Sequence, residues 1–147
     1  MTADQLIEAL ELAPHPEGGW YRETWRAKAD PGERSSASAV YYVLKPGQRS
    51  HWNRVDADEI WLWHAGDPVD VAIAADDFSA PSTVRLGGRV GQGEQPQLIV
   101  PKDHWQAAEP VAGEAGFTFI SCVVAPAFDF SGFELAEPGW APGHPRG

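Results

Sequence analysis

The stretch SHWNRVDADEIWLWHAG, residues 50–66, decides the fold. If it is extended, successive side chains point to opposite faces of a β-strand. His51 and Asn53 then share one face of a strand, and Glu59 and Trp61 share a face of the next. If the two strands form a hairpin, an imidazole, an amide and a carboxylate converge beside indole rings. A partly apolar site with a few converging polar groups is typical of a small-molecule pocket.

Short apolar or alternating runs, separated by turns rich in glycine and proline, fill most of the remaining sequence. The runs that we expect to be strands are Trp20–Arg26, Ala37–Leu44, Ser50–Val55, Glu59–His64, Val69–Ala74, Val84–Leu86, Gln97–Val100 and Phe117–Val124. Many short strands without intervening helices predict an all-β antiparallel sandwich or barrel. Closing the sheet into a barrel removes exposed edges that would otherwise favour aggregation.

One segment, at the N-terminus, has the pattern of a helix. Thr2 followed by Gln5 forms a capping-box pattern, and Leu6 and Leu10 recur at helical spacing. Pro14 ends the helix because proline lacks an amide donor and restrains the residue before it. We therefore expect a short N-terminal helix ahead of the strands.

The length of 147 residues corresponds to about one ordinary domain. The sequence contains no internal repeat and no linker wide enough to divide it, so we expect a single domain over residues 1–147. Residues 137–147 form a tail rich in proline and glycine, which we expect to pack loosely.

The formal net charge of −10 argues against nucleic acid as a partner, because nucleic-acid binders need a basic stripe and none is visible. The single cysteine, Cys122, excludes an internal disulfide and fits a reducing compartment. The N-terminus has acidic and polar residues and no long apolar run. We therefore expect a cytoplasmic protein without a membrane segment.

The 50–66 stretch resembles the first motif of the cupin superfamily, in which two histidines, a glutamate and a glycine follow one another. His51, Glu59 and Gly66 match this motif, and Asn53 stands where the second histidine would be. The segment from Pro101 to Gln106 resembles the second cupin motif, with Gln106 at the third histidine's position. This resemblance implies a double-stranded β-helix, the jelly-roll barrel of the cupins.

The cupin resemblance also raises the question of a divalent metal. The resemblance implies a metal on His51 and Glu59, with Gln106 or His104 completing the set. Neutral amides are weak ligands for zinc and iron, so the amides of Asn53 and Gln106 weaken such a site. The alternative is a metal-free pocket in which His51 and Glu59 bind each other or water. No cofactor is therefore certain.

A second stretch, HPEGGWYRET at residues 15–24, narrows the resemblance. Together with Tyr41-Tyr42 and the segments at 58–61, 105–108 and 124–128, it is similar to a small branch catalogued as a cupin domain of unknown function. The resemblance extends from about Leu6 to about Leu135. It implies a homodimer and no settled activity.

Residues 19–23 are also similar to the start of the dTDP-4-keto-6-deoxysugar epimerases, and His51 resembles their catalytic histidine. An imidazole near its reference pKa is suited to take a proton next to a ketone. The opposite proton donor is commonly a tyrosine, and spacing does not choose among Tyr21, Tyr41 and Tyr42. The catalytic pair assigned here is His51 with Tyr21.

Three functions remain open from the sequence. The first is a metal-independent isomerase or epimerase of a sugar or sugar-nucleotide, with His51 as base. The second is a non-catalytic module that binds a small polar or carbohydrate-like metabolite, and the third is a metal-dependent enzyme with atypical ligands. The residues that we expect to contact the small-molecule ligand are Glu23, Tyr41, Asn53, Glu59, Trp61 and Gln106.

Overall fold

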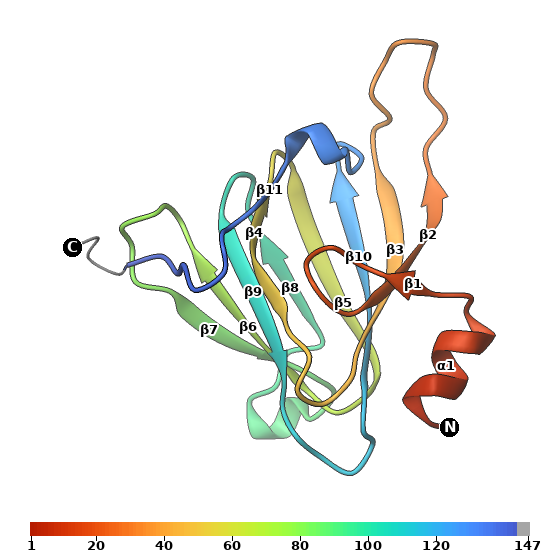
Figure 1. The fold of residues 1–147 in the computed structure, drawn as a ribbon, viewed down its shortest axis with the longest axis vertical. Coiled ribbons are helices and arrows are strands. Elements are labelled where there is room, and N and C mark those ends of the chain that lie inside the picture. Colours follow the sequence, from red (N-terminus) through yellow and green to blue (C-terminus); the bar gives the residue numbers. More distant parts are fainter. Residues whose placement is uncertain (144–147) are drawn as a thin grey trace.

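The computed structural model describes residues 1–143 of the chain. It opens with a short helix, α1 (Ala3–Ala9), whose first turn is closed by the expected capping box between Thr2 and Gln5. Two antiparallel sheets follow and face each other, with α1 on one side and the C-terminal segment on the other (Figure 1). Within residues 1–143, no helix is both long and apolar enough to cross a bilayer.

The first sheet has six strands. In spatial order they are β1 (Ala13–Pro14), β2 (Trp20–Arg26), β3 (Ser38–Leu44), β10 (Thr118–Ala125), β5 (Asp58–Gly66) and β8 (Gln97–Val100). The second sheet has five, in the order β11 (Phe133–Leu135), β4 (Ser50–Val55), β9 (Trp105–Pro110), β6 (Val69–Ala74) and β7 (Ser82–Leu86). Two 3-10 turns, η1 (Val90–Gln92) and η2 (Phe130–Gly132), connect strands. The fold is the expected all-β jelly roll with a short N-terminal helix.

Side chains from both sheets meet in the space between them and form the main core. Its buried members are Tyr42, Leu44, Trp61, Val69, Val71, Leu86, Leu98, Val100, Ala108, Ile120 and Cys122. β10 lies at the centre of the first sheet, where Cys122 is paired with Val40 of β3 and Trp61 of β5. Strand alternation therefore places one face of β3, β5 and β10 inside the barrel.

Two smaller apolar clusters cover the outer faces of the sheets. Leu6 of α1 packs with Val43 on the outside of the first sheet. On the outside of the second sheet, the ring of Trp140 lies 4.5 Å from that of Trp105. Within the tail that we expected to pack loosely, Trp140 and Ala141 instead pack against this cluster, whereas residues 137–139 are exposed. Residues 144–147 lie outside the described part.

The strand predictions were accurate where the sequence alternates. Four strands, β2, β4, β6 and β8, have the predicted bounds. β9 was not predicted, because its alanines at 107 and 108 give a weak strand signal. It forms because both of its edges are paired, one with β4 and one with β6.

β4 contains a bulge that sets which side chains enter the barrel. Ser50 pairs with Ala108 and Asn53 pairs with Gln106, so three steps along β4 match two along β9. One extra residue in a strand interrupts its alternation. As a result Ser50 and Asn53, three residues apart, are both buried, at 1% exposure each.

Candidate functional site

A cavity of about 50 Å³ lies between the sheets, beneath the loop of residues 15–19. Its lining comprises His15, Glu17, Tyr21, Val40, Tyr42, Asn53, Val55, Glu59, Cys122, Val124, Phe128 and Phe133. It is small beside the ~300–1,000 Å³ of pockets for drug-sized ligands. The cavity therefore has room for the reactive part of a small molecule.

The 15–19 loop is held against β3 and β4 by hydrogen bonds to its own carbonyl groups. The backbone N–H of His51 donates to the carbonyl of Glu17 at 2.8 Å, and the Tyr42 hydroxyl donates to the carbonyl of Gly18. Gly18 has φ +111°, and a Cβ there would lie 2.0 Å from the Arg49 carbonyl oxygen. Only glycine accommodates both the backbone conformation and the close approach.

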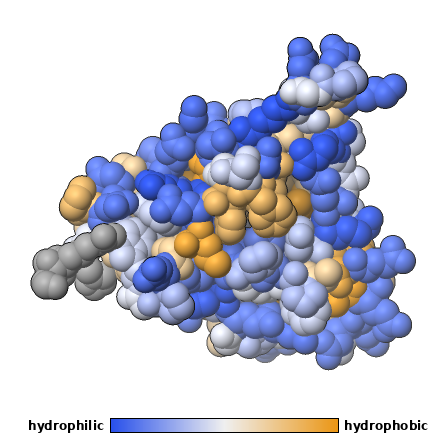
Figure 2. Space-filling model, turned by 45° about the horizontal axis from the view of Figure 1, so that its top comes forward, coloured by the Kyte–Doolittle hydropathy of each residue, from blue (hydrophilic) through white to orange (hydrophobic). Residues whose placement is uncertain are grey.

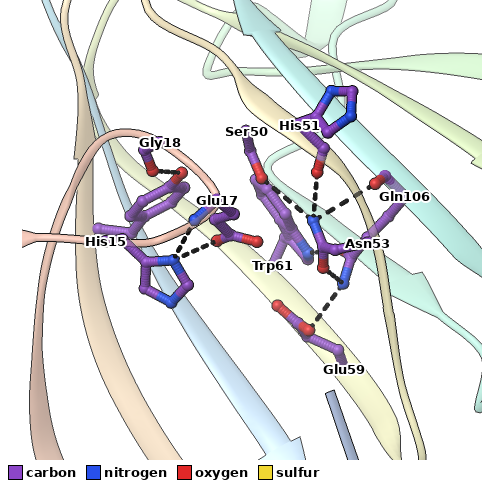
Figure 3. A network of polar contacts seen from close by, with 10 residues as sticks. His15, Glu17, Gly18, Ser50, His51, Asn53, Glu59, Trp61 and Gln106 are labelled. Atoms are coloured by element: carbon purple, nitrogen blue, oxygen red, sulfur yellow. Dashed lines mark hydrogen bonds and ion pairs between the residues drawn. The ribbon is translucent and has the colours of Figure 1, made fainter. Parts of the chain in front are cut away.

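This loop presents His15 and Glu17 to the cavity (Figure 3). Nδ1 of His15 accepts a hydrogen bond from the backbone N–H of Glu17 at 3.0 Å. Burial lowers the pKa of His15 to about 4, so the ring is neutral at pH 7. A neutral ring whose Nδ1 accepts carries its proton on Nε2, which makes Nε2 a donor.

Two carboxyls occupy the same cavity. Burial, and then the charge of Glu59, raise the pKa of Glu17 to about 8, although contacts with the Ser50 and Tyr42 hydroxyls counteract part of the rise. Burial also raises the pKa of Glu59, and hydrogen bonds from Gln106 and Cys122 oppose it. With a pKa of about 8, Glu17 is mostly protonated at neutral pH.

Gln106 connects Glu59 to the opposite sheet. Its Oε1 accepts from the Trp61 indole N–H at 2.9 Å, which turns its amide nitrogen toward Glu59, also at 2.9 Å. The same nitrogen lies 3.4 Å from Oδ1 of Asn53. Asn53 in turn donates to the carbonyl of His51 at 2.7 Å. The amides thus hold one another and Glu59 in fixed positions (Figure 3).

A groove of about 440 Å³ adjoins the cavity. The two share Tyr21, Val40 and Phe128, and the groove adds Glu23, Arg26, Asp129 and Phe130 to its lining. The rings of Phe128, Phe130 and Phe133 contact one another edge to face. Figure 2 shows apolar side chains gathered on this end of the molecule, with hydrophilic residues around them.

Several of the predicted site residues meet here. Tyr21, Asn53 and Glu59 line the cavity, and Trp61 and Gln106 lie directly behind Glu59. Glu23 lines the outer groove. Tyr41 does not take part, because it faces outward from the first sheet, where its ring packs 5.4 Å from that of Phe119.

His51 is the main correction to the sequence-based site. Because of the bulge in β4, its side chain does not follow Asn53 into the barrel but points away from Glu59 (Figure 3). Its Nε2 lies 3.0 Å from the carbonyl oxygen of Glu137, in a separate surface groove of about 510 Å³. His51 and Tyr21 therefore do not form the expected catalytic pair in one cavity.

The donor atoms in the cavity do not fit the divalent metal that the motif implies. Of the expected ligands His51, Glu59 and Gln106, only Glu59 and Gln106 are in contact. In that contact the amide N–H of Gln106 points toward Glu59, so its oxygen is not directed at a position where a metal could bind both residues. Between residues 1 and 143, no three His, Cys, Asp or Glu side chains are grouped to hold a metal ion. His104 hydrogen-bonds its own loop, at the carbonyl of Lys102.

His15 and Glu17 are the functional candidates that strand reasoning missed. They lie in a loop, where alternation says nothing about direction. The signal in the sequence is the Gly18-Gly19 pair directly after them, since paired glycines mark a backbone that approaches another closely. A search for polar residues beside such a pair would have found both.

Comparison with protein families relates the chain to one of them. The family model described as "Cupin superfamily (DUF985)" matches residues 4–136. A search of curated proteins found no match.

Two solved structures are similar over nearly their whole length. A hypothetical protein from Leishmania major is 34% identical, with a TM-score of 0.83, and the match covers 91% of this chain and 86% of that one. A structural-genomics target from Shewanella oneidensis is 36% identical, also with a TM-score of 0.83, over 92% and 85% of the two chains. An oxalate decarboxylase mutant from Bacillus subtilis is 16% identical, with a TM-score of 0.62, and the match covers 83% of this chain and 29% of that one. At this identity the similarity shows a common fold alone.

Proposed function

The chain belongs to the cupin superfamily, in the family described as DUF985, and on that premise we propose that its cavity binds a small carbonyl compound and moves a proton on it. The observation that carries the proposal is that a neutral imidazole and two carboxyls, from His15, Glu17 and Glu59, line one cavity. Titratable groups with perturbed pKa values in a cleft are candidates for catalysis.

His15 is the group that would bind the carbonyl oxygen. Its Nε2–H is free to donate because Nδ1 is occupied by the Glu17 N–H. A neutral imidazole that donates a hydrogen bond stabilises negative charge as it develops on a carbonyl oxygen, and a depressed pKa keeps that proton in place at neutral pH.

Glu59 and Glu17 are the proton-transfer groups. Glu59 takes a proton from the carbon next to the carbonyl, and an enol or enolate forms at the oxygen that His15 holds. Glu17, protonated at neutral pH, returns a proton to carbon. The overall reaction is an isomerisation or epimerisation in which no atoms are lost.

This proposal keeps the reaction class suggested by the sequence but assigns it to other residues. A sugar-nucleotide is a poor fit for the cavity, because its phosphates would need cations. In the described part of the chain the lining contains neither lysine nor arginine, and the cavity of about 50 Å³ admits only a small group. A small uncharged or cationic carbonyl compound fits both features.

Exchange of carbon-bound protons tests the proposal. Hydroxyacetone in D2O is followed by NMR with the wild-type protein, H15Q, E59Q and the control H51Q, whose ring lies outside the cavity. We expect H51Q to exchange like wild type and the cavity variants to be slower by about 10²–10⁴-fold. Binding without exchange in the wild type would instead favour a metabolite-binding module.

A further inference from the structure

We propose that the ligand of the cavity carries a cationic nitrogen group, such as a primary ammonium, beside its carbonyl, and that the cavity rejects anions. This inference deepens the proposed function and rests on it for the carbonyl. It concerns the charge of the ligand, which the acid–base chemistry alone leaves open.

The first support is that no basic side chain accompanies the carboxyls of the cavity. Glu59 is 8% exposed and the Glu17 side chain 14%, yet the described residues that line the cavity include no lysine or arginine. The partners of Glu59 are the neutral Gln106 and Cys122. Buried carboxylates are normally paired with a cation. A cation on the ligand would supply the missing partner.

Aromatic rings complete the surroundings of such a cation. Tyr21, Tyr42, Phe128 and Phe133 all contribute to the lining. The His15 ring packs edge-on to Tyr21 at 4.4 Å and lies 6.0 Å from Tyr42. A cation over the face of an aromatic ring is attracted by the ring quadrupole, most strongly where water is excluded.

His15 gives a second sign that a ligand belongs here. Its side chain is only 9% exposed, and within residues 1–143 its Nε2 has no hydrogen-bond partner in the protein. Nε2 is not one of the fully buried atoms that lack a partner, so solvent reaches it, and an acceptor on a ligand can replace a water there. The ligand thus needs an oxygen for His15 and a donor or cation for Glu59.

The adjoining groove has an excess of acidic side chains. The outer groove contains Glu23 and Asp129, and the one cation among its described residues, Arg26, is paired with Glu23 at 2.6 Å. The net charge of the chain is −10. Clefts lined by one sign of charge concentrate ligands of the other sign, so cations are drawn to this end of the barrel.

The titratable groups around Glu17 offer a ligand cation no like charge. They are His15 on its own loop, Tyr42 on β3, Glu59 on β5 and Cys122 on β10. None of them is positive at pH 7. A cation can therefore enter the cavity while Glu17 keeps the proton that the proposed reaction needs.

Three probes with one carbon skeleton test the charge preference: aminoacetone, hydroxyacetone and pyruvate. Their dissociation constants are measured by calorimetry at pH 7 under anaerobic conditions. We expect aminoacetone to bind at least tenfold tighter than hydroxyacetone, and pyruvate not to bind.

The variants separate the site from the rest of the surface. E59Q should reduce the preference for aminoacetone by about tenfold, whereas H51Q should retain it; circular dichroism verifies that each variant is folded. Equal binding of aminoacetone and hydroxyacetone, an unchanged preference in folded E59Q, or no binding of any probe would overturn the inference.

The two proposals fail in different ways. If aminoacetone is preferred but no probe exchanges its carbon-bound protons with D2O, the charge inference stands and the proton-transfer function is lost. If hydroxyacetone exchanges rapidly without any preference for aminoacetone, the function stands and the charge inference is lost.

Discussion

The amide of Gln106 donates a hydrogen bond to Oε1 of Glu59 at 2.9 Å, across the space between the two sheets. This contact joins β9 to β5 and holds a buried carboxyl in the cavity. The other end of the amide is fixed by the Trp61 indole. Gln106 therefore cannot rotate to offer its oxygen to Glu59 without losing the bond to Trp61.

Gln106→Leu removes a neutral partner from Glu59 at nearly constant volume. The substitution removes two hydrogen bonds of Gln106, one to Glu59 and one to the Trp61 indole. The free energy of unfolding should therefore fall by about 2–4 kcal/mol. Urea denaturation measures the change. Gln97→Leu on the exposed face of β8 is the control and should change stability by less than about 0.5 kcal/mol. Equal stabilities of the two variants would contradict the arrangement.

Glu17 makes stability fall as the pH rises. Its pKa is about 8 in the folded protein and near 4.5 when unfolded, so the folded state binds more protons between these values. Relative to E17Q, the wild type should lose roughly 3–5 kcal/mol between pH 4.5 and 8 and no more above. Chemical denaturation across this range gives the difference. If the free energies of unfolding of the wild type and E17Q change in parallel with pH, the Glu17 carboxyl is solvated.

His15 acts in the opposite direction. Its pKa falls from 6.5 to about 4 on folding, so the unfolded state binds more protons between these values. The stability of the wild type relative to H15Q should therefore fall by roughly 3 kcal/mol as the pH drops from 6.5 to 4. A pH series of thermal unfolding with both proteins detects it. A difference that does not vary with pH would contradict a buried neutral ring.

Gly18 is held in place by both conformation and space. It has φ +111°, and the Arg49 carbonyl oxygen lies 2.0 Å from the position that a Cβ would occupy. Gly18→Ala should therefore lower the free energy of unfolding by about 3 kcal/mol or more and displace the loop. Gly47→Ala is a matched control, because Gly47 also has a positive φ, +81°, but no atom within 4 Å of its Cβ position. That control should cost about 1 kcal/mol. Equal denaturation midpoints for the two variants would show that the close approach is absent.

The sequence was informative where side chains alternate. The bounds of β2 and β4 follow from apolar and polar residues in turn, and the placement of Glu59 inside follows from the same rule. Alternation cannot by itself say which of two adjacent residues points inward. Tyr41 and Tyr42 illustrate this, because the register of β3 against β10 puts Tyr42 inside and Tyr41 outside.

The remaining errors have specific physical causes. The bulge in β4 depends on how β4 pairs with β9, a contact between segments more than 50 residues apart, and it turns His51 out of the barrel. The 15–19 loop is folded by bonds to distant backbone and side-chain groups at residues 42 and 51, so its direction is not encoded in local periodicity. Those long-range contacts place His15 and Glu17 in the site.

The titration of Glu17 tests the central claim, that two carboxyls share one buried cavity. Carbon-13 NMR of the side-chain carboxyls gives the midpoint directly in the wild type and in E59Q. We predict a midpoint of about 8 in the wild type, and a lower one in E59Q because the charge of Glu59 is then absent. A midpoint near 4.5 that is the same in both proteins would contradict the claim.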